Sequence, residues 1–557
     1  MRLRLLVTIL LAPALGCAGP AERSSSVDEA LARASEGIRP EGIRAHMEFL
    51  ADDALEGRRP GTRGYELAAR YARAHFEALG LRGGVEGGGY FQPVPLRRGE
   101  ALPQGCALIL KGPRGTRPLR FEKDFIFFDT QAGTERRVSA PVVFAGFGVT
   151  APEQGYDDYA GLDVKGKIVA MLWNGPPSFP ATVRAYYADD LTKQENAAAH
   201  GAIGIIGVRS PDDERRFTWP DMIRETHIGS GSLRWIDEAG RPVGLLESIR
   251  VRTDLNRSGA EALFAGEAHS LKEIFAAAEN GKPPAFALRK RATIRRRSRH
   301  TPVQSENVVA VLEGSDPALR DEYVVYTAHL DHLGVGPAVG GDTIYNGALD
   351  DAAGSAVVLE AARAFAALPR PPRRSVVFLL VTGEEAGLLG SDYFAEHPTV
   401  PRERIVADLN FDGSAAFFPV KDVIALGEDH SSLKPLVRRA AAATGFEVSP
   451  DPFPEETFFI RSDQYSLVRR GIPSVAVDLG LESLDPAIDG AAVVKKWLVT
   501  NYHSPKDDMA QPFHFESTAR LARLAFLLGH AVATQEARPR WNAGDFFGQR
   551  FGRRAGS

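Results

Sequence analysis

The sequence predicts an α/β fold with an open sheet, and two kinds of segment support this prediction. Three apolar runs of strand length occupy residues 324–328, 376–381 and 405–411. Between the first two runs, residues 352–368 are rich in small and apolar side chains and are expected to form a helix that packs on the sheet. Strands and helices therefore alternate along the chain, which is the order expected of an α/β sheet.

Histidine and acidic residues follow the three runs or stand in short polar motifs beyond them. They are His329, Asp331, Asp350, Glu384, Glu385, Asp412 and His503. Because the ligand crevice of an open α/β sheet lies at the carboxyl ends of its strands, we expect these side chains to converge. Any one of them alone can be a surface group, and Glu384 with Glu385 can simply begin a charged helix at 386–395. Two histidines with three carboxylates suit a pair of zinc ions that share one bridging ligand.

The order His-x-Asp, Asp-Asp-x-x-Gly, Gly-Glu-Glu, Asp and Tyr-His resembles the co-catalytic zinc aminopeptidase family, whose relatives include glutamate carboxypeptidase and the transferrin receptor. The resemblance covers most of the chain. It implies a zinc exopeptidase core with a mixed twisted sheet flanked by helices. It also implies that Asp350 bridges two zinc ions, with the remaining ligands divided between the two sites. These are His329 and Asp412 for one site, and Glu385 and His503 for the other.

The same resemblance suggests roles for four further residues. Glu384 would be the general base that moves a proton from water to the leaving amine. Asp331 is placed to accept the hydrogen bond of the second imidazole nitrogen of His329. Tyr502 would donate its hydroxyl to the oxyanion of the intermediate. Arg461 resembles an arginine that some relatives use near the substrate carbonyl, although it can equally be an exposed loop residue.

Two positions depart from the family pattern. Many relatives carry Asn after the bridging aspartate and Ser before the glycine, whereas this chain has Asp351 and Ala353. Asp351 is a candidate cap for the helix that follows it. The family has a cis peptide bond after the bridging aspartate, and we expect the same between Asp350 and Asp351.

The length of 557 residues is too great for one core, so two or more domains are expected. Residues 126–290 consist of short strands around a small helix and resemble a protease-associated domain, which either shapes substrate access or is a packing module. The basic run at 289–299 is expected to be a solvated strand that returns from this insert. The net charge of −4 gives no sign of a nucleic-acid partner.

The N-terminus resembles a bacterial lipoprotein signal peptide. A basic start precedes the apolar run Leu5–Leu15, which is too short to span a bilayer, and Cys17 follows it. We expect an exported protein whose only membrane attachment is a lipid on Cys17. It would be an outer-membrane lipoprotein facing the periplasm or the surface, or a soluble periplasmic protein if Cys17 is not acylated. Only Cys106 then remains, so no disulfide is expected within the mature fold.

The chain is therefore divided into six parts. They are a signal peptide (1–17), a tether (18–38), an N-terminal part of the catalytic domain (39–125), the insert (126–290), the catalytic core (291–535) and a tail (536–557). The predicted function is an aminopeptidase that acts on peptides. The alternatives are a carboxypeptidase of the same fold, which needs a cationic clamp for the substrate carboxylate, a receptor-like protein without catalysis, and a glutaminyl cyclase.

Overall fold

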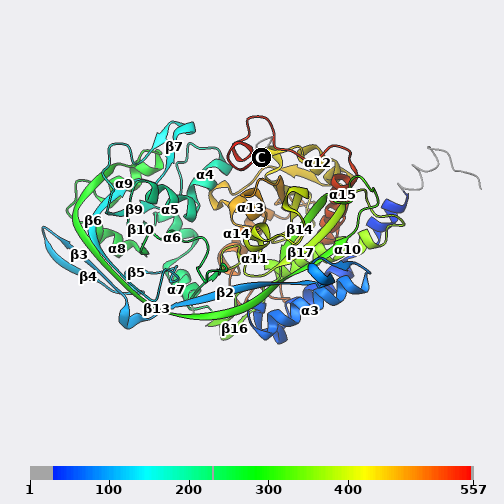
Figure 1. The fold of residues 1–557 in the computed structure, drawn as a ribbon, viewed down its shortest axis with the longest axis horizontal. Coiled ribbons are helices and arrows are strands. Elements are labelled where there is room, and N and C mark those ends of the chain that lie inside the picture. The colour runs from blue at the N-terminus through cyan, green and yellow to red at the C-terminus, as the bar shows by residue number, and fades with distance from the viewer. Residues whose placement is uncertain (1–28, 229–230, 415, 553–557) are drawn as a thin grey trace, which may run out of the picture.

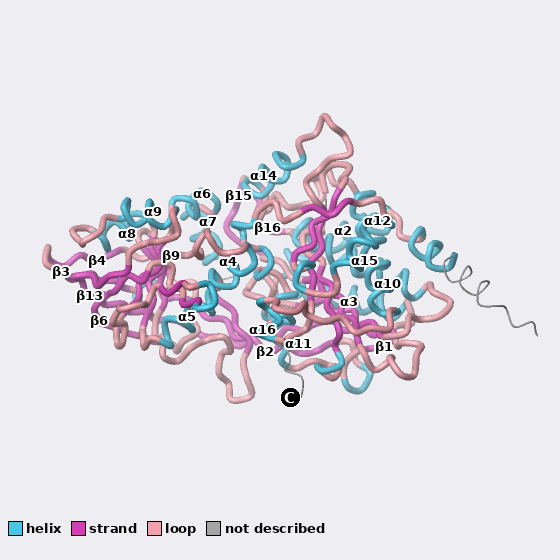
Figure 2. The backbone as a smooth tube through the Cα atoms, turned by 90° about the horizontal axis from the view of Figure 1, so that it is seen from above, coloured by secondary structure: helices cyan, strands magenta, loops and turns pink. Residues whose placement is uncertain are grey.

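The computed structural model describes residues 29–228, 231–414 and 416–552, which form two lobes (Figures 1 and 2). The predicted signal peptide, the start of the tether and the last five residues of the tail lie outside the described residues. Within the described part of the chain, no helix is both long enough and apolar enough to cross a membrane.

The larger lobe is built on a mixed sheet, as predicted. Its strands lie in the order β11 (Ser232–Trp235), β2 (Phe91–Ala101), β13 (Ala285–Leu312), β17 (Ser375–Val381), β14 (Tyr323–His329), β18 (Ile405–Asn410), β21 (Ser474–Leu479), β19 (Asp422–Leu426) and β20 (Glu447–Ser449). The short strand β1 (Arg82–Gly83) pairs with the end of β13. Strands β17, β14, β18 and β21 are parallel, whereas β13 and β19 run antiparallel to their neighbours β17 and β21.

Helices cover both faces of this sheet, which explains why its central strands are apolar throughout. On β14, Val324 and Tyr326 belong to one core, and Val325 between them belongs to the core on the opposite face. The first face is covered by α2 (Pro40–Leu50), α3 (Arg63–Ala78), α10 (Gly354–Ala366), α12 (Lys434–Ala443) and α15 (Phe515–Thr534). The second face is covered by α11 (Leu389–Glu396) and α13 (Gln464–Val468).

The smaller lobe has its own sheet, and its hydrophobic core continues into the larger lobe through Phe459, Ile460, Tyr465 and Val468. Its strands are β3 (Ala107–Gly112), β4 (Gly115–Leu119), β5 (Phe125–Ile126), β6 (Glu135–Ala145), β9 (Ile168–Leu172), β10 (Gly204–Val208), β12 (Arg252–Leu255) and the first half of β13. Its helices are α4 (Ala181–Ala188), α5 (Asp190–Ala199), α6 (Pro211–Arg216), α7 (Trp219–His227), α8 (Arg257–Phe264) and α9 (Leu271–Glu279). Strands β3 and β4 precede residue 126, so this sheet begins earlier in the chain than the segment singled out in the sequence.

Strand β13 is 28 residues long and runs through both lobes, as the green ribbon along the lower side of Figure 1 shows. The basic run lies in this strand, and its side chains alternate between exposed and buried positions. The predicted solvated strand is therefore confirmed, with one exception. Arg296 is buried, and its guanidinium donates to the backbone carbonyls of Asp129, Ala132 and Gly133.

The C-terminal tail packs between the lobes through α16 (Phe546–Phe551). The ring of Phe547 is fully buried and lies 4.9 Å from that of His430 and 5.1 Å from that of Phe459, both in the larger lobe. On its other side, the same ring lies 6.4 Å from Tyr186 of α4 in the smaller lobe. The tail aromatics thus pack on the larger lobe and also reach the smaller lobe.

Candidate metal centre

The predicted ligands meet at one edge of the central sheet. His329 is the last residue of β14, the pair Glu384 and Glu385 follows β17, and Asp412 follows β18. Because these three strands are parallel neighbours, their carboxyl ends lie side by side. Asp350 reaches the same place from the helical turn Ala348–Ala353, which leads into α10.

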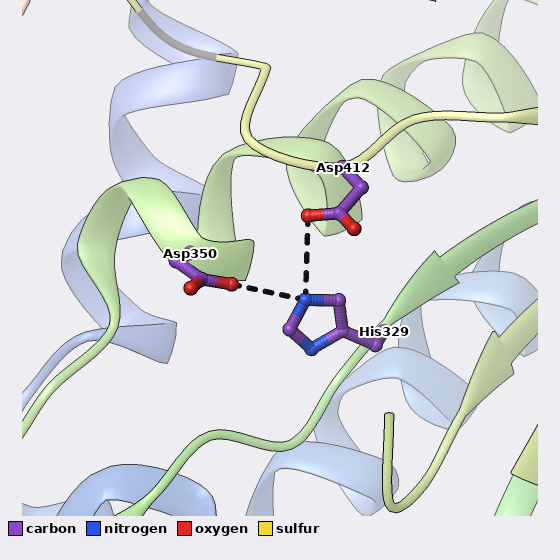
Figure 3. Close-up of side chains that lie close together, drawn as sticks. All are labelled: His329, Asp350 and Asp412. Atoms are coloured by element: carbon purple, nitrogen blue, oxygen red, sulfur yellow. Dashed lines mark ion pairs between the residues drawn. The ribbon is translucent and has the colours of Figure 1, made fainter. Parts of the chain in front are cut away.

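The first group of side chains surrounds the imidazole of His329 (Figure 3). Its Nε2 lies 3.1 Å from Oδ1 of Asp350 and 3.5 Å from Oδ1 of Asp412. Its Nδ1 hydrogen-bonds to the backbone carbonyl of Asp331 at 3.0 Å, while the Asp331 carboxylate is 3.9 Å away. The hydrogen bond predicted for the Asp331 carboxylate is therefore made by its backbone instead. The carboxylate accepts the backbone N–H of Glu384 at 3.2 Å.

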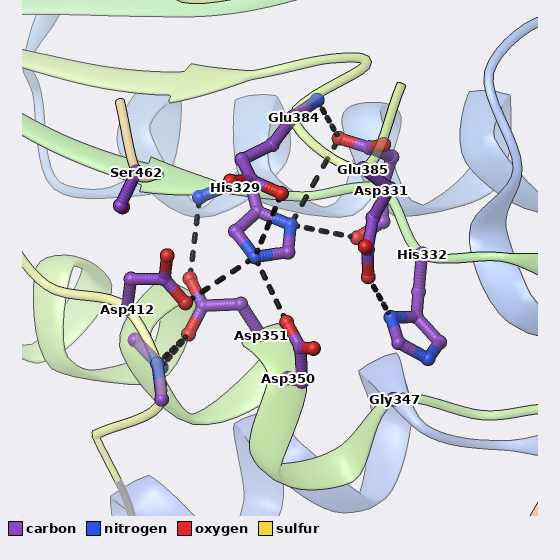
Figure 4. Close-up of polar contacts among 12 residues, drawn as sticks. His329, Asp331, His332, Gly347, Asp350, Asp351, Glu384, Glu385, Asp412 and Ser462 are labelled. Carbon is purple, nitrogen blue, oxygen red and sulfur yellow. Dashed lines mark hydrogen bonds and ion pairs between the residues drawn. The ribbon is translucent and has the colours of Figure 1, made fainter. Parts of the chain in front are cut away.

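The second group surrounds Glu385, which faces His332 in Figure 4. Oε2 of Glu385 lies 3.1 Å from Nε2 of His503, and Oε1 lies 2.5 Å from Nδ1 of His332. The other oxygen of Asp350, Oδ2, lies 3.4 Å from Nε2 of His503. Asp350 therefore presents one carboxylate oxygen to each histidine of the predicted ligand set.

These donor atoms suit a cation. The Nε2 atoms of His329, His332 and His503 are buried and have no hydrogen-bond partner among the described residues. Three sets of nearby side chains among the described residues could each hold an ion. They are His329, Asp350 and Asp412; His332, Asp350 and Glu385; and His329, Glu384 and Glu385. Imidazole nitrogens together with carboxylate oxygens are the ligands of catalytic zinc sites.

The charges at the site shift the pKa values of its members strongly. Burial disfavours the imidazolium of His329, but Glu384, Asp350 and Asp412 outweigh it and raise its pKa well above the ordinary value. For Glu384, burial together with the charges of Asp412 and Glu385 raises the pKa well above the usual range. For Glu385, burial and Asp350 are outweighed by His503 and His332, and the pKa falls to about 2. Two adjacent glutamates therefore differ in how readily they hold a proton.

Two buried aspartates fix the backbone around Asp350. The carboxylate of Asp351 accepts the backbone N–H groups of His329, Gly354 and Gly413, at 3.2, 2.9 and 3.1 Å, and so ties two strand ends to the start of α10. It caps the helix as expected. The carboxylate of Asp507 accepts the backbone N–H groups of Leu349 and Asp350, at 2.8 and 3.0 Å. The peptide bond between Asp350 and Asp351 is cis, as predicted.

Tyr502 and Arg461 lie together at the mouth of the site. The ring of Tyr502 stacks on that of His503 at 3.8 Å. Arg461 is exposed, and its Nη2 donates to the Tyr502 hydroxyl at 3.4 Å. Burial raises the pKa of Tyr502, so this hydroxyl keeps its proton and can act as a donor.

The sequence reasoning missed three residues of this site: His332, Asp507 and Glu225. His332 stands one residue after Asp331, and its ring occupies the space that a side chain at Gly347 would fill, since a Cβ there would lie 2.5 Å from the ring. Asp507 lies four residues after His503 in an ordinary polar stretch. Glu225 belongs to the smaller lobe and hydrogen-bonds to Nδ1 of His503 at 2.8 Å. Of these three, only His332 could have been identified from the sequence, because it stands beside the predicted ligand motif.

Two cavities adjoin the centre. One, of about 200 Å³, is lined by Asp350, Glu384 and Asp412 and by a largely apolar wall. The apolar wall includes Phe417, Phe418, Ile424, Leu426, Phe453, Phe458, Val477 and Trp497. The other, of about 530 Å³, lies between the lobes and is lined by Glu385, His503, His332 and Glu225.

Comparison with known proteins agrees with this geometry. Residues 307–528 match Peptidase family M28. A "Probable zinc metalloprotease" of Pyrenophora teres f. teres is 38% identical over 112 residues, which are 20% of this chain and 23% of that protein. The mouse "Aminopeptidase NAALADL1" is 30% identical over 179 residues, 31% of this chain and 22% of that protein. Each match therefore spans less than a quarter of the relative's own length.

The fold as a whole is similar to a solved structure, the "Aminopeptidase from Aneurinibacillus sp. strain AM-1". The TM-score is 0.52 at 18% sequence identity, and the similarity covers 90% of this chain and 96% of that one. The matched residues 307–528 contain all five predicted metal ligands, helix α10 and most of helix α15. Over residues 307–528, the chain is therefore similar to Peptidase family M28.

Proposed function

We propose that the protein is a two-zinc exopeptidase that removes N-terminal residues from peptides. The observation that carries the proposal is the position of Asp350. Its two carboxylate oxygens lie 3.1 and 3.4 Å from the Nε2 atoms of two different histidines, His329 and His503. Each of these histidines has a second carboxylate beside it, Asp412 in one case and Glu385 in the other. Such an arrangement suits two cations that share one bridging ligand.

Glu384 is the proposed general base. When bound, two zinc ions supply Lewis acidity that lowers the pKa of water and polarises a carbonyl group. Glu384 accepts the proton of the attacking water and passes it to the leaving amine. Its raised pKa suits this role, because a base whose pKa lies nearer the working pH both accepts and releases a proton readily.

Tyr502 and Arg461 are proposed to act on the substrate carbonyl. Tyr502 donates its hydroxyl to the oxygen on which negative charge develops during attack. Arg461 contacts this hydroxyl at 3.4 Å and adds positive charge on the same side of the site. Asp331 holds the backbone of Glu384 in place and so orients the base.

The smaller cavity supports a preference for an apolar N-terminal residue. Its wall is aromatic and aliphatic, and Asp350, Glu384 and Asp412 lie at one end, where they favour a free amino group. Phe453 and Phe458 line this cavity. Phe459 does not, because its ring is buried against Phe547 instead.

The first experiment tests whether the protein contains zinc and needs it for activity. Elemental analysis of the purified protein should find about two zinc ions per chain, and removal of zinc by a chelator should abolish peptide hydrolysis until zinc is returned. A protein that hydrolyses peptides without bound metal would refute the proposal.

The direction of cleavage is tested with blocked substrates. Unblocked dipeptides and aminoacyl anilides with an apolar first residue should be hydrolysed, whereas their N-acetylated forms should largely resist. The reason is that acetylation removes the charge and the donors that the carboxylates bind, a loss of about 1–3 kcal/mol in binding. Equal hydrolysis of free and acetylated substrates would contradict an aminopeptidase.

One observation favours a second candidate, a carboxypeptidase or an enzyme that grips both ends of a dipeptide. Four arginines line the larger cavity, and three of them are paired with acidic residues. The fourth, Arg59, makes no ion pair or side-chain hydrogen bond with any residue that the structure describes. Burial, with the charge of Arg98, lowers its pKa to about 9, so it remains positively charged at neutral pH. A substrate carboxylate would be its natural partner.

The two candidates differ in whether the enzyme binds the C-terminal carboxylate of the substrate. If Arg59 binds a carboxylate, Arg59→Ala should raise KM about 10- to 100-fold for dipeptides with a free C-terminus and leave amidated dipeptides unaffected. Arg234→Ala is the matched control, since this arginine lines the same cavity but is paired with Asp129 at 3.0 Å. The same change for free and amidated substrates would remove the second candidate.

A further inference from the structure

His503 differs from the other histidine of the predicted ligand set in where its second ring nitrogen finds a partner. For His329, that partner is the backbone carbonyl of Asp331, two residues away. For His503, it is the carboxylate of Glu225, 278 residues away in the chain, at 2.8 Å. Glu225 belongs to α7 of the smaller lobe, so an interaction between the lobes reaches the candidate metal centre.

The contact determines which nitrogen of His503 carries its proton. A carboxylate oxygen 2.8 Å from Nδ1 accepts a hydrogen bond, so Nδ1 holds the hydrogen of the neutral ring. Nε2 then keeps its lone pair, and it faces Oε2 of Glu385 at 3.1 Å and Oδ2 of Asp350 at 3.4 Å. The ring therefore presents a free donor nitrogen toward the two carboxylates with which it would share a cation.

Several contacts hold the helix that carries Glu225 in place. A capping box between Thr218 and Asp221 closes its first turn. Its Met222 is fully buried, and the indole of Trp219 donates to the backbone of Glu122 at 2.8 Å. The next residue after the helix, Ile228, packs against Gly336 of the hairpin formed by β15 (Gly334–Val339) and β16 (Asp342–Tyr345) in the larger lobe. The position of Glu225 is thus fixed from both lobes.

Local structure alone does not orient His503 in this way. The residue lies beyond the end of α14 (Gly490–Thr500), in a loop, with a positive φ of 50° that non-glycine residues seldom adopt. Stacking on Tyr502 constrains the plane of the His503 ring. A half-turn about the Cβ–Cγ bond would still leave the ring in this plane and move Nδ1 to the opposite edge. The carboxylate of Glu225 accepts a hydrogen bond from the edge of the ring that carries Nδ1, and so it selects one of these two orientations.

We propose that Glu225 of the inserted lobe is a positioning residue for the zinc site that contains His503 and Glu385. This inference rests on the proposed two-zinc function. It gives the inserted lobe a specific task, because the lobe supplies the carboxylate that orients a metal ligand of the other lobe. By linkage, zinc bound at this site also stabilises the contact between the lobes.

The proposal is tested by zinc affinity, measured by competition with a chelating dye, on the full-length protein. In Glu225→Ala, one of the two zinc ions should bind about 10- to 100-fold more weakly, and the other should be unaffected. Glu225→Gln keeps an acceptor oxygen at the same place, so it should fall between the alanine variant and the wild type. The glutamine variant decides the question if the alanine variant does not fold.

Glu122→Ala is the matched control. Glu122 lines the same cavity and pairs with a histidine, His227, at 3.1 Å, but that histidine is no part of the metal centre. Both zinc affinities should stay at the wild-type values in this variant.

A double variant separates this inference from the proposed function. His503→Ala should weaken the same zinc ion as Glu225→Ala, and the two changes together should cost no more than His503→Ala alone, since Glu225 acts through that ring. If the wild type binds two zinc ions and His503→Ala loses one, while Glu225→Ala and Glu225→Gln bind both as tightly as the wild type, this inference is wrong and the proposed function stands. If His503→Ala does not alter zinc binding, the proposed function itself fails.

Discussion

Glu384 and Glu385 are adjacent in the chain, yet their carboxylates face different partners. Glu385 lies within 3.1 Å of two histidines, which lower its pKa to about 2 despite its burial. Glu384 lies no nearer than 3.9 Å to His329, and burial raises its pKa instead. A permanent anion suits a metal ligand, whereas a carboxylate that readily takes a proton suits a base.

The two glutamates should therefore respond differently to the same substitution. Glu384→Gln should keep both zinc ions and lower kcat by about 10²- to 10⁴-fold, because only proton transfer is lost. Glu385→Gln should weaken the binding of one zinc ion. Zinc content and kcat, measured on the same preparations, distinguish these results. Loss of the same amount of zinc from both variants would contradict the division of roles.

Tyr502 provides a second test at this scale. Tyr502→Phe keeps the ring that stacks on His503 but removes the hydroxyl, so zinc content should stay near normal. Because the hydroxyl is proposed to stabilise charge that develops only during the reaction, kcat should fall about 10²-fold with little change in KM. Steady-state kinetics on an aminoacyl anilide measures both constants. A change confined to KM would mean that the hydroxyl binds the substrate in its ground state.

At the scale of secondary-structure elements, the sequence identified the strands and the ligands at their ends for a physical reason. Strands β14, β17 and β18 are buried on both faces, so each appears in the sequence as an apolar run, and a charged residue directly after such a run stands out. Glu225 and Asp507 do not follow an apolar run, so the sequence does not single them out. Each contacts residues that are distant in the chain, and only the fold brings the partners together.

Strand β18 also carries a buried acid whose effect on stability can be tested. Asp408 lies next to β14 and accepts a hydrogen bond from the Thr327 hydroxyl at 3.0 Å. Burial raises its pKa from 3.8 to about 8. The folded protein therefore keeps a proton between about pH 4 and pH 8 that the unfolded chain releases. Stability should fall as the pH rises through this window, by about 1.4 kcal/mol per pH unit.

Asp408→Asn removes the titrating group and should remove this fall. Urea unfolding at pH 5 and at pH 8, with a chelator present so that zinc release does not contribute, gives the free energy of unfolding of both proteins. The variant should gain stability relative to the wild type as the pH is raised. If the variant and the wild type differed in the free energy of unfolding by the same amount at both pH values, Asp408 would be ionised in the folded protein at both.

At the scale of the whole molecule, several connections hold the lobes together around the candidate metal centre. Strand β13 belongs to both sheets, Glu225 contacts His503, and α16 packs between α4 and the larger lobe. Arg216 of α6 also pairs with Glu456 of the larger lobe at 3.3 Å. The third of these connections, through α16, lies away from the candidate metal centre, so it can be weakened without touching a predicted ligand.

Phe547 is the centre of that third connection and gives the last prediction. Its ring is fully buried among His430, Phe459 and Tyr186, so Phe547→Ala should lower the free energy of unfolding by about 3–5 kcal/mol. Gln549→Ala, an exposed position on the same helix, is the control and should have little effect. Chemical denaturation measures both, and zinc content should match that of the wild type at temperatures where the variant remains folded. If Phe547→Ala were no less stable than the control, the tail would not be part of the folded core.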